Sequence, residues 1–409
     1  MEKTVVLSFL FLVLHLAPAK ASLNVGVGVG VGVGIGIGNG GGRGGGGGGA
    51  NSPPEPSGPS LSKMGVAYKS LQAWKSAITD DPLRILDTWV GSNVCSYKGV
   101  FCSSDSSSGG PAVTGIDLNH GNIEGTLVND LYLLTDLSLF HLNTNRFTGT
   151  LPETFQDLSS LEELDLSNNQ FSGDFPSVIL NMPSLIYLDL RFNSFSGPLP
   201  DQLFSKNLDA ILVNNNQFQG EIPQNLASSS ASVINLANNK FTGNIPITSL
   251  GLVRGYNSKL KEILFLNNQL TGCIPQGMGL FRDVQVLDAS FNSLVGHLPE
   301  TLSCLQDIEV LNLAHNQLSG ELSDVICSLR SLVNLTVAYN FFNRLSQECS
   351  RLLIRNVGFD FSDNCIPGRD MQRPQPECSL IPGGSLSCLR IPIPKPLDCA
   401  SLTIIPPSP

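Results

Sequence analysis

The 409-residue sequence is short of basic side chains and of long apolar runs. Lys and Arg number 24 against 34 Asp and Glu, so the formal net charge at pH 7 is −10. Because a nucleic-acid partner requires Lys and Arg to neutralise its phosphates, this balance excludes nucleic acid and favours basic partners. Beyond the N-terminal segment no run reaches the roughly 20 apolar residues of a membrane-spanning helix, so we expect no membrane span.

The N-terminal segment has the pattern of a secretory signal peptide. Lys3 precedes an apolar run over residues 5–16, and small residues suited to cleavage follow at Ala19 and Ala21. We assign residues 1–21 to the signal and expect a secreted, extracellular protein; an uncleaved membrane helix would need a longer run. Residues 22–62 alternate Gly with Val or Ile and then become Gly-rich and Pro/Ser-rich, which predicts a disordered spacer.

Ten cysteines in an exported chain predict disulfides. Cys95 and Cys102 favour a small disulfide loop, because a zinc site would need a second pair of ligands. This loop belongs to a predicted N-terminal cap, residues 63–112. The cap is expected to open with a helix that ends at Asp81 and Pro82 and has these residues at helical spacing: Tyr68, Leu71, Trp74 and Ile78.

A repeat begins near Val113 with the template L-x-x-L-x-L-x-x-N-x-L-x-G-x-[LI]-P. Its steps are 23 or 24 residues, except for one of 29 that contains an insertion near residues 251–258. Such a long phase indicates an α/β solenoid, a plant-type leucine-rich-repeat superhelix of about ten to eleven repeats over residues 113–356. The template's asparagine position holds Gly121, Asn145, Asn169, Asn193, Asn216, Asn239, Asn268, Asn292, Asn316 and Asn340.

Each repeat is expected to form a short strand whose leucines point inward, and neighbours must stack to bury them. The asparagine amide is expected to hydrogen-bond the backbone where the chain leaves the strand, so that stacked amides form a ladder. The Gly-x-[Leu/Ile]-Pro end resembles the plant-specific subclass, which adds a second short strand.

The C-terminal residues 357–409 read as a Cys-rich cap, containing a degenerate eleventh repeat at Asn364, and a short Pro-rich tail. Disulfide caps protect the exposed end of a solenoid, and we place Cys349 and Cys365 in this one. Cys304 and Cys327 occupy near-equivalent positions in adjacent repeats, so we pair them as a hypothesis. Cys273 has no evident partner, which leaves open an intermolecular bond through it or Cys399.

The strand residues between the leucines are expected to face the concave side of the solenoid. There the first repeats carry an acidic strip together with aromatic residues, which suits a basic peptide. The alternative is a solvated face of an acidic protein. The predicted partner-binding residues are Asp117, His141, Glu163, Asp165, Tyr187, Asp189, Arg191, Phe192 and Phe291.

Asn334 begins the only Asn-x-Ser/Thr sequon, and glycosylation there would direct binding to the earlier repeats.

Catalysis is not expected. The histidines beyond the signal lie on separate repeats, without metal-ligand spacing or a nucleophile, so we expect no enzyme, cofactor or metal site. Asp165 and Asp189 could form a carboxylate pair on adjacent strands, yet their spacing is also the ordinary one of the repeat.

Blocks more specific than the repeat resemble plant leucine-rich repeat extensins over about residues 63–400. They include residues 71–75 (LQAWK), 94–97 (VCSY), 189–195 (DLRFNSF), 233–241 (VINLANNKF) and 264–273 (LFLNNQLTGC). The resemblance implies an apoplastic protein that binds basic, Cys-rich rapid alkalinisation factor peptides in cell-wall integrity and growth, and that tends to dimerise. Where the family has a Ser-Pro extensin tail, this sequence has only a short Pro-rich stretch after Cys399. We treat the glycine-rich segment as a hypothetical contact with wall polymers.

Two other functions fit the same scaffold. One is an inhibitor of a wall-degrading enzyme such as a polygalacturonase, which would also use the concave face. The other is a structural wall protein without a specific ligand. The specific blocks favour the peptide-binding function over both.

Overall fold

The computed structural model describes residues 62–106, 110–247 and 259–379 together with Cys388 and Cys399. All of them belong to one compact unit, Pro59–Pro409. The expected signal peptide, the spacer, the insertion near residues 251–258 and the Pro-rich tail lie outside the described residues.

The cap helix α2 (Lys63–Ser76) is shorter than its sequence spacing predicted. Ser62 caps it, because its Oγ accepts a hydrogen bond from Gly65 N at 3.2 Å, and the buried side chains include Trp74. The helix ends at Ser76 because the next residues form a strand, β1 (Ile78–Asp80), which pairs antiparallel with β4 (Glu124–Thr126). Ile78 therefore lies on a strand, and the prediction of a helix as far as Asp81 was wrong.

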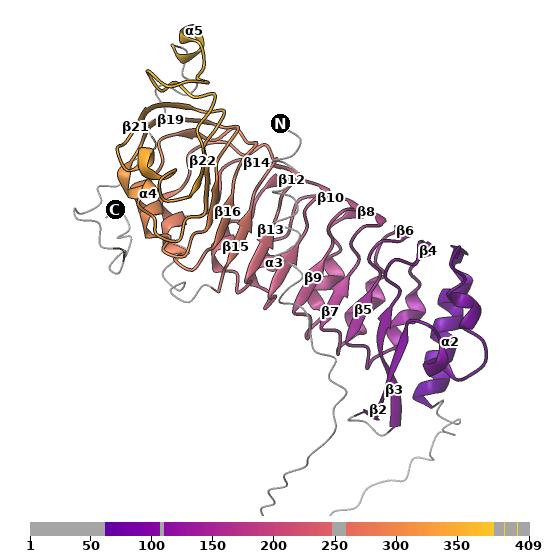
Figure 1. Ribbon diagram of the computed structural model, residues 1–409. Helices are drawn as coiled ribbons and strands as arrows, with labels where there is room; N and C mark the ends of the chain where they lie inside the picture. Colours follow the sequence, from indigo (N-terminus) through magenta and orange to yellow (C-terminus); the bar gives the residue numbers. More distant parts are fainter. Residues whose placement is uncertain (1–61, 107–109, 248–258, 380–387, 389–398, 400–409) are drawn as a thin grey trace, which may run out of the picture. The chain divides into compact units, whose positions relative to one another are not determined.

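A 12-stranded sheet runs the length of the described unit (Figure 1). It opens with an antiparallel hairpin and continues with parallel strands, one from each repeat. In order its strands are β2 (Val100–Ser106), β3 (Gly110–Asp117), β5 (Leu139–His141), β7 (Glu163–Asp165), β9 (Tyr187–Asp189), β11 (Ala210–Leu212), β13 (Val233–Asn235), β15 (Glu262–Leu264), β16 (Val286–Asp288), β18 (Val310–Asn312), β20 (Asn334–Thr336) and β22 (Gly358–Asp360).

A second set of strands follows the asparagine of the repeats, as the plant-specific template predicted. One sheet contains β1, β4, β6 (Arg146–Gly149), β8 (Gln170–Asp174), β10 (Ser194–Gly197), β12 (Gln217–Glu221) and β14 (Lys240–Thr242). A shorter one contains β17 (Val295–Gly296), β19 (Gln317–Leu322) and β21 (Phe341–Leu345). Buried phenylalanines stack behind the first, with ring centroids 6.2–6.5 Å apart: Phe147, Phe171, Phe195, Phe218 and Phe241.

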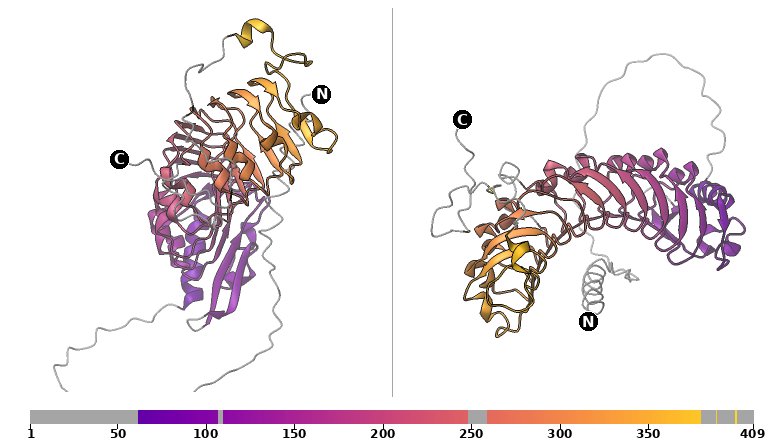
Figure 2. Two further views of the ribbon diagram at one scale, coloured as in Figure 1. Left: turned by 90° about the vertical axis from the view of Figure 1, so that its left-hand side faces the viewer. Right: turned by 90° about the horizontal axis from the view of Figure 1, so that it is seen from above.

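Short helices complete the repeats, and Figure 2 shows the same stacking of strands and helices from two further sides. The 3-10 helices are η1 (Leu86–Thr88), η2 (Val94–Ser96), η3 (Asn129–Leu133), η4 (Glu153–Asp157), η5 (Ser177–Asn181), η6 (Gln224–Ser228), η8 (Gln276–Leu280), η9 (Glu300–Cys304) and η10 (Cys349–Arg351). Single α-helical turns occur at α3 (Gln202–Ser205), α4 (Asp324–Cys327) and α5 (Gln375–Cys378).

The expected asparagine ladder is present. In a representative rung, Asn216 Oδ1 accepts from Phe195 N at 3.0 Å, and its Nδ2 donates to Leu190 O at 2.9 Å and Val213 O at 3.2 Å. One amide thus satisfies buried backbone groups of its own repeat and of the preceding one. The ladder continues to Asn364, whose Oδ1 accepts from Phe342 N at 2.9 Å, so the degenerate eleventh repeat forms a complete rung.

Five disulfides close the caps and the later repeats, and two of them overturn the pairing expected from repeat spacing. Cys95–Cys102 closes the small N-terminal loop, and Cys365–Cys378 closes the C-terminal one. The pairing of Cys304 with Cys327 was wrong: the bonds are Cys304–Cys399, Cys327–Cys349 and Cys273–Cys388. The physical reason is that the C-terminal tail returns to earlier repeats at Cys388 and Cys399, which also leaves no thiol at Cys273 or Cys399 for an intermolecular bond.

Candidate functional site

We call the side of the 12-stranded sheet that faces away from the leucine core the strand face. Sheet register sets its neighbours: His141 is paired with Asp165, Asp165 with Asp189, and Glu163 with Tyr187. Because side chains alternate along a strand, all of these residues point to the strand face while Leu164 and Leu188 are buried behind them. Six of the nine predicted residues therefore meet on β5, β7, β9 and the turn after β9: His141, Glu163, Asp165, Tyr187, Asp189 and Arg191.

Part of the acidic charge is already paired within the cluster. His141 Nε2 lies 3.1 Å from Glu163 Oε2, and Arg191 Nε lies 2.9 Å from Asp189 Oδ2. Asp165 Oδ1 accepts from Ser167 N at 2.9 Å and from its hydroxyl at 2.5 Å, which supports the chain as it leaves the strand. The acids thus have a structural role, and Glu163 and Asp165 also remain partly exposed to a partner.

Asp189 differs from the other acids because its side chain is fully buried. Burial, and to a smaller extent the nearby Asp165 carboxylate, raises the pKa of its carboxyl to about 8, although Arg191 acts in the opposite direction. Burial likewise raises the pKa of the Tyr187 hydroxyl, which lies 3.4 Å from Asp189 Oδ2. At neutral pH the Asp189 carboxyl therefore retains its proton and adds no negative charge to the strip.

The two predicted phenylalanines lie in the turns after their strands, in a backbone conformation that is unusual for such residues. Phe192 and Phe291 both have φ of +54°, at a position where four other repeats use Asn, and they are 40% and 47% exposed. Phe192 follows β9 and borders the acidic cluster. Phe291 follows β16 and is separated from it by β11, β13 and β15.

Phe291 instead begins an aromatic stack that was not among the predicted site residues. Its ring centroid lies 4.0 Å from that of His315, and His315 lies 4.0 Å from Tyr339. Burial lowers the pKa of His315. The signal was available in the sequence, because all three residues directly precede the template's asparagine.

The remaining predicted residues lie on other strands. Asp117, on β3, is paired with His141 in the sheet. Asn334, the sequon residue, is partly exposed on the strand face of β20, and its Oδ1 accepts from Thr336 Oγ1 at 3.0 Å. It stands six strands from Asp189 along the sheet, so a glycan there would leave the acidic cluster open.

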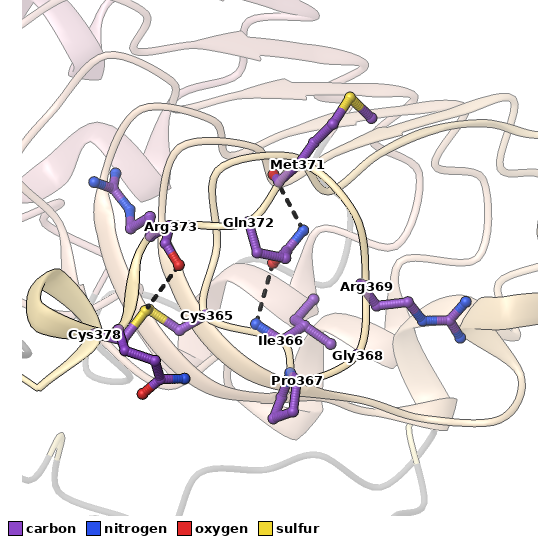
Figure 3. A pocket seen from close by; sticks show the side chains of 10 residues that line it. Cys365, Ile366, Pro367, Gly368, Arg369, Met371, Gln372, Arg373 and Cys378 are labelled. Atoms are coloured by element: carbon purple, nitrogen blue, oxygen red, sulfur yellow. Dashed lines mark hydrogen bonds between the residues drawn. A yellow bond between two sulfur atoms is a disulfide. The ribbon is translucent and has the colours of Figure 1, made fainter.

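A separate pocket lies in the C-terminal cap, and sequence reasoning missed it (Figure 3). Its volume is about 340 Å³, and the loop closed by Cys365–Cys378 forms its wall. Gln372 holds this loop together, because its Oε1 accepts from Ile366 N at 3.1 Å. The lining residues are Cys365, Ile366, Pro367, Gly368, Arg369, Met371, Gln372, Arg373, Gln375 and Cys378.

Comparison with known proteins places this repeat array in a family. A leucine-rich repeat family model matches residues 135–195, a second matches 307–329, and a leucine-rich repeat N-terminal domain model matches 68–103. Leucine-rich repeat extensin-like protein 6 of Arabidopsis thaliana is 53% identical over 363 residues, which cover 87% of this chain and 71% of that protein. The chain belongs to the leucine-rich repeat extensin-like family.

Other members and solved structures extend the comparison. Leucine-rich repeat extensin-like protein 2 of Arabidopsis thaliana is 48% identical over 81% of this chain, which spans only 41% of that protein. The Arabidopsis receptor kinase HAESA, solved with the peptide hormone IDA and the co-receptor SERK1, is 25% identical with a TM-score of 0.57 over 73% of this chain and 53% of its own. In the part of this extensin-like chain that the structure describes, no helix has the length and apolarity needed to cross a bilayer.

Proposed function

We propose that this protein is secreted to the cell wall and binds a basic, cysteine-rich peptide of the rapid alkalinisation factor type in wall integrity and growth control. The observation that carries the proposal is the cluster of acidic and aromatic side chains on β5, β7 and β9. Carboxylates steer the encounter with a basic partner, and aromatic residues supply contact area at low entropic cost. The similarity to HAESA, which was solved with a peptide hormone, supports the same class of ligand.

The geometry of the cluster suits recognition of a basic side chain. Glu163 and Asp165 lie on one strand, separated by the buried Leu164, so both carboxylates project from the same side of β7. Tyr187 stands beside Glu163 in the neighbouring strand, and Phe192 provides an exposed ring at the border. A Lys or Arg of the peptide would meet a carboxylate and an aromatic ring at once.

Calorimetry with a synthetic, oxidised rapid alkalinisation factor peptide tests the proposal on the full secreted chain. We expect the double variant Glu163→Gln, Asp165→Asn to weaken binding by about tenfold or more, which corresponds to about 1.4 kcal/mol. The control, Asp174→Asn with Glu221→Gln, makes the same charge change on exposed residues of the second sheet, on β8 and β12. It should leave the affinity within about twofold, since distant exposed charges are screened by salt.

Equal losses in the two double variants would show that only net charge matters and would contradict a site on β7. Absence of binding by the wild type at both low and physiological salt would overturn the proposed function. Titration against a polygalacturonase would then test the enzyme-inhibitor function on the same protein.

A further inference from the structure

Two buried polar atoms without hydrogen-bond partners lie on neighbouring turns of the strand face. They are Arg191 Nε, after β9, and Asn214 Oδ1, after β11. The turns are adjacent, because Phe192 N donates to Asn214 O at 3.0 Å. Arg191 Nε lies 2.9 Å from Asp189 Oδ2, but its N–H does not point at that oxygen, so no hydrogen bond forms.

Arg191 and Asn214 stand two residues before the template's asparagine. In other repeats the polar side chains of this row have hydrogen-bond partners. Asn119 Oδ1 accepts from Asn143 N at 2.6 Å, and Asn143 Nδ2 donates to Ser167 Oγ at 2.5 Å. Ser290 Oγ donates to Asp288 at 2.6 Å. At the remaining described rungs the row has apolar side chains or a bonded serine: Ala237, Leu266, Ala314, Ala338 and Ser362.

An unmet buried polar group is costly, so the pair at Arg191 and Asn214 calls for a partner outside the row. Both atoms are covered in the free protein, although Asn214 is 6% exposed and the Arg191 side chain 22% exposed, so a group on the strand face reaches them once the two side chains turn outward. The exposed ring of Phe192 lies beside them, and the acidic residues of β7 are one strand from β9 and two from β11.

We propose that Arg191 and Asn214 together bind one backbone peptide unit of an extended ligand segment. The Arg191 guanidinium donates to the ligand C=O, and Asn214 Oδ1 accepts from a ligand N–H. Neighbouring strands are about 4.8 Å apart, so side chains from two adjacent turns can approach one peptide unit together. This inference rests on the proposed peptide-binding function and adds to it a contact that holds the peptide's main chain, whereas Glu163 and Asp165 select its basic side chains.

A carboxylate ligand is the competing chemistry, and the two differ in what they require of residue 214. A carboxylate only accepts hydrogen bonds, so it would need the Asn214 amide turned to present Nδ2 as a donor. A peptide N–H needs an acceptor. Asn214→Asp keeps an acceptor and removes the donor, whereas Asn214→Leu removes both and has a precedent in the same row at Leu266.

The test measures affinity for the oxidised alkalinisation peptide and thermal stability of the free protein for wild type, Asn214→Leu and Asn214→Asp. We expect Asn214→Leu to weaken binding about tenfold while its melting temperature stays equal or rises, because an unsatisfied buried atom is removed. Asn214→Asp should bind at least as well as wild type. A synthetic peptide series N-methylated at successive backbone positions should contain one member that loses affinity for wild type but not for Asn214→Leu.

Each of the other possible results contradicts a particular part of this proposal. If wild type binds and Asn214→Leu binds equally well, the main-chain contact is wrong and the peptide-binding function stands. If Asn214→Asp loses as much affinity as Asn214→Leu, the bound group is a carboxylate. A lowered melting temperature of Asn214→Leu with unchanged affinity would assign Asn214 a purely structural role. If wild type does not bind the peptide, both the function and this inference fail.

Discussion

Replacing Asp189 with Asn should change how the stability of the protein depends on pH. In the folded protein the buried carboxyl has a pKa of about 8, whereas in the unfolded chain an Asp titrates near about 3.9. Between these values the folded state holds a proton that the unfolded state has lost. The free energy of unfolding is therefore highest below pH 4 for this group and falls as pH rises to about 8.

The size of the effect follows from the pKa difference. Between pH 5 and pH 8 the free energy of unfolding should decrease by up to about 4 kcal/mol through Asp189. Asn resembles the protonated carboxyl in shape, and its Oδ1 can still accept the hydrogen bond that Arg191 N donates at 3.0 Å. Asp189→Asn should therefore be close to wild type at pH 5 and more stable than wild type at pH 8.

Urea unfolding of both proteins at pH 5, 6, 7 and 8 measures this difference. Asp288 is also buried with a raised pKa, so it contributes a slope of the same sign to both proteins and cancels in the comparison. Asp174→Asn, on the exposed edge of β8, controls for the loss of one charge. Parallel stability profiles of wild type and Asp189→Asn from pH 5 to pH 8 would refute the reasoning, as would a variant that loses stability toward pH 8.

Two further predictions concern the scaffold. Asn216→Ala should lower the free energy of unfolding by about 3 kcal/mol or more, because it leaves buried backbone groups of two repeats unpaired. In thermal melts the control Gln219→Ala, at an exposed residue, should change the melting temperature little. Equal changes in the two variants would contradict the role of the ladder. Non-reducing peptide mapping of Cys304→Ser should find a free thiol at Cys399 and an intact bond from Cys327; a free Cys327 would restore the pairing that the structure contradicts.

The solenoid was predictable because every repeat has the same buried leucines and the same asparagine that bonds the backbone. Leu164 and Leu166 had to be buried together, and the amide of Asn169 had to pair with the backbone of two repeats, at every step of 23 or 24 residues. The end of the first helix was not predictable in this way. Ile78 fits a helical face by spacing, but an unpaired edge at Glu124–Thr126 recruits it into a strand, and that edge exists only once the repeats have stacked.

The cysteine pairing shows a second limit of repeat reasoning. Positions 304 and 327 are near-equivalent in the template, yet equivalent positions in adjacent repeats also carry side chains that point in parallel. The partner of Cys304 is instead 95 residues away, and that of Cys273 is 115 residues away. Both partners belong to a segment outside the repeat phase, so spacing within the array contained no information about them.

The acidic strip shows why residue type alone did not give the charge of the site. Asp117, Asp165 and Asp189 occupy one template position, and each accepts a hydrogen bond from the backbone N–H two residues on. Their neighbours in the sheet differ. Asp165 lies beside His141, whereas Asp189 lies between Asp165 and the buried Leu212, and this environment keeps its proton on. The charge available to a basic partner is therefore set by side chains one repeat away, and it is concentrated on β3 and β7.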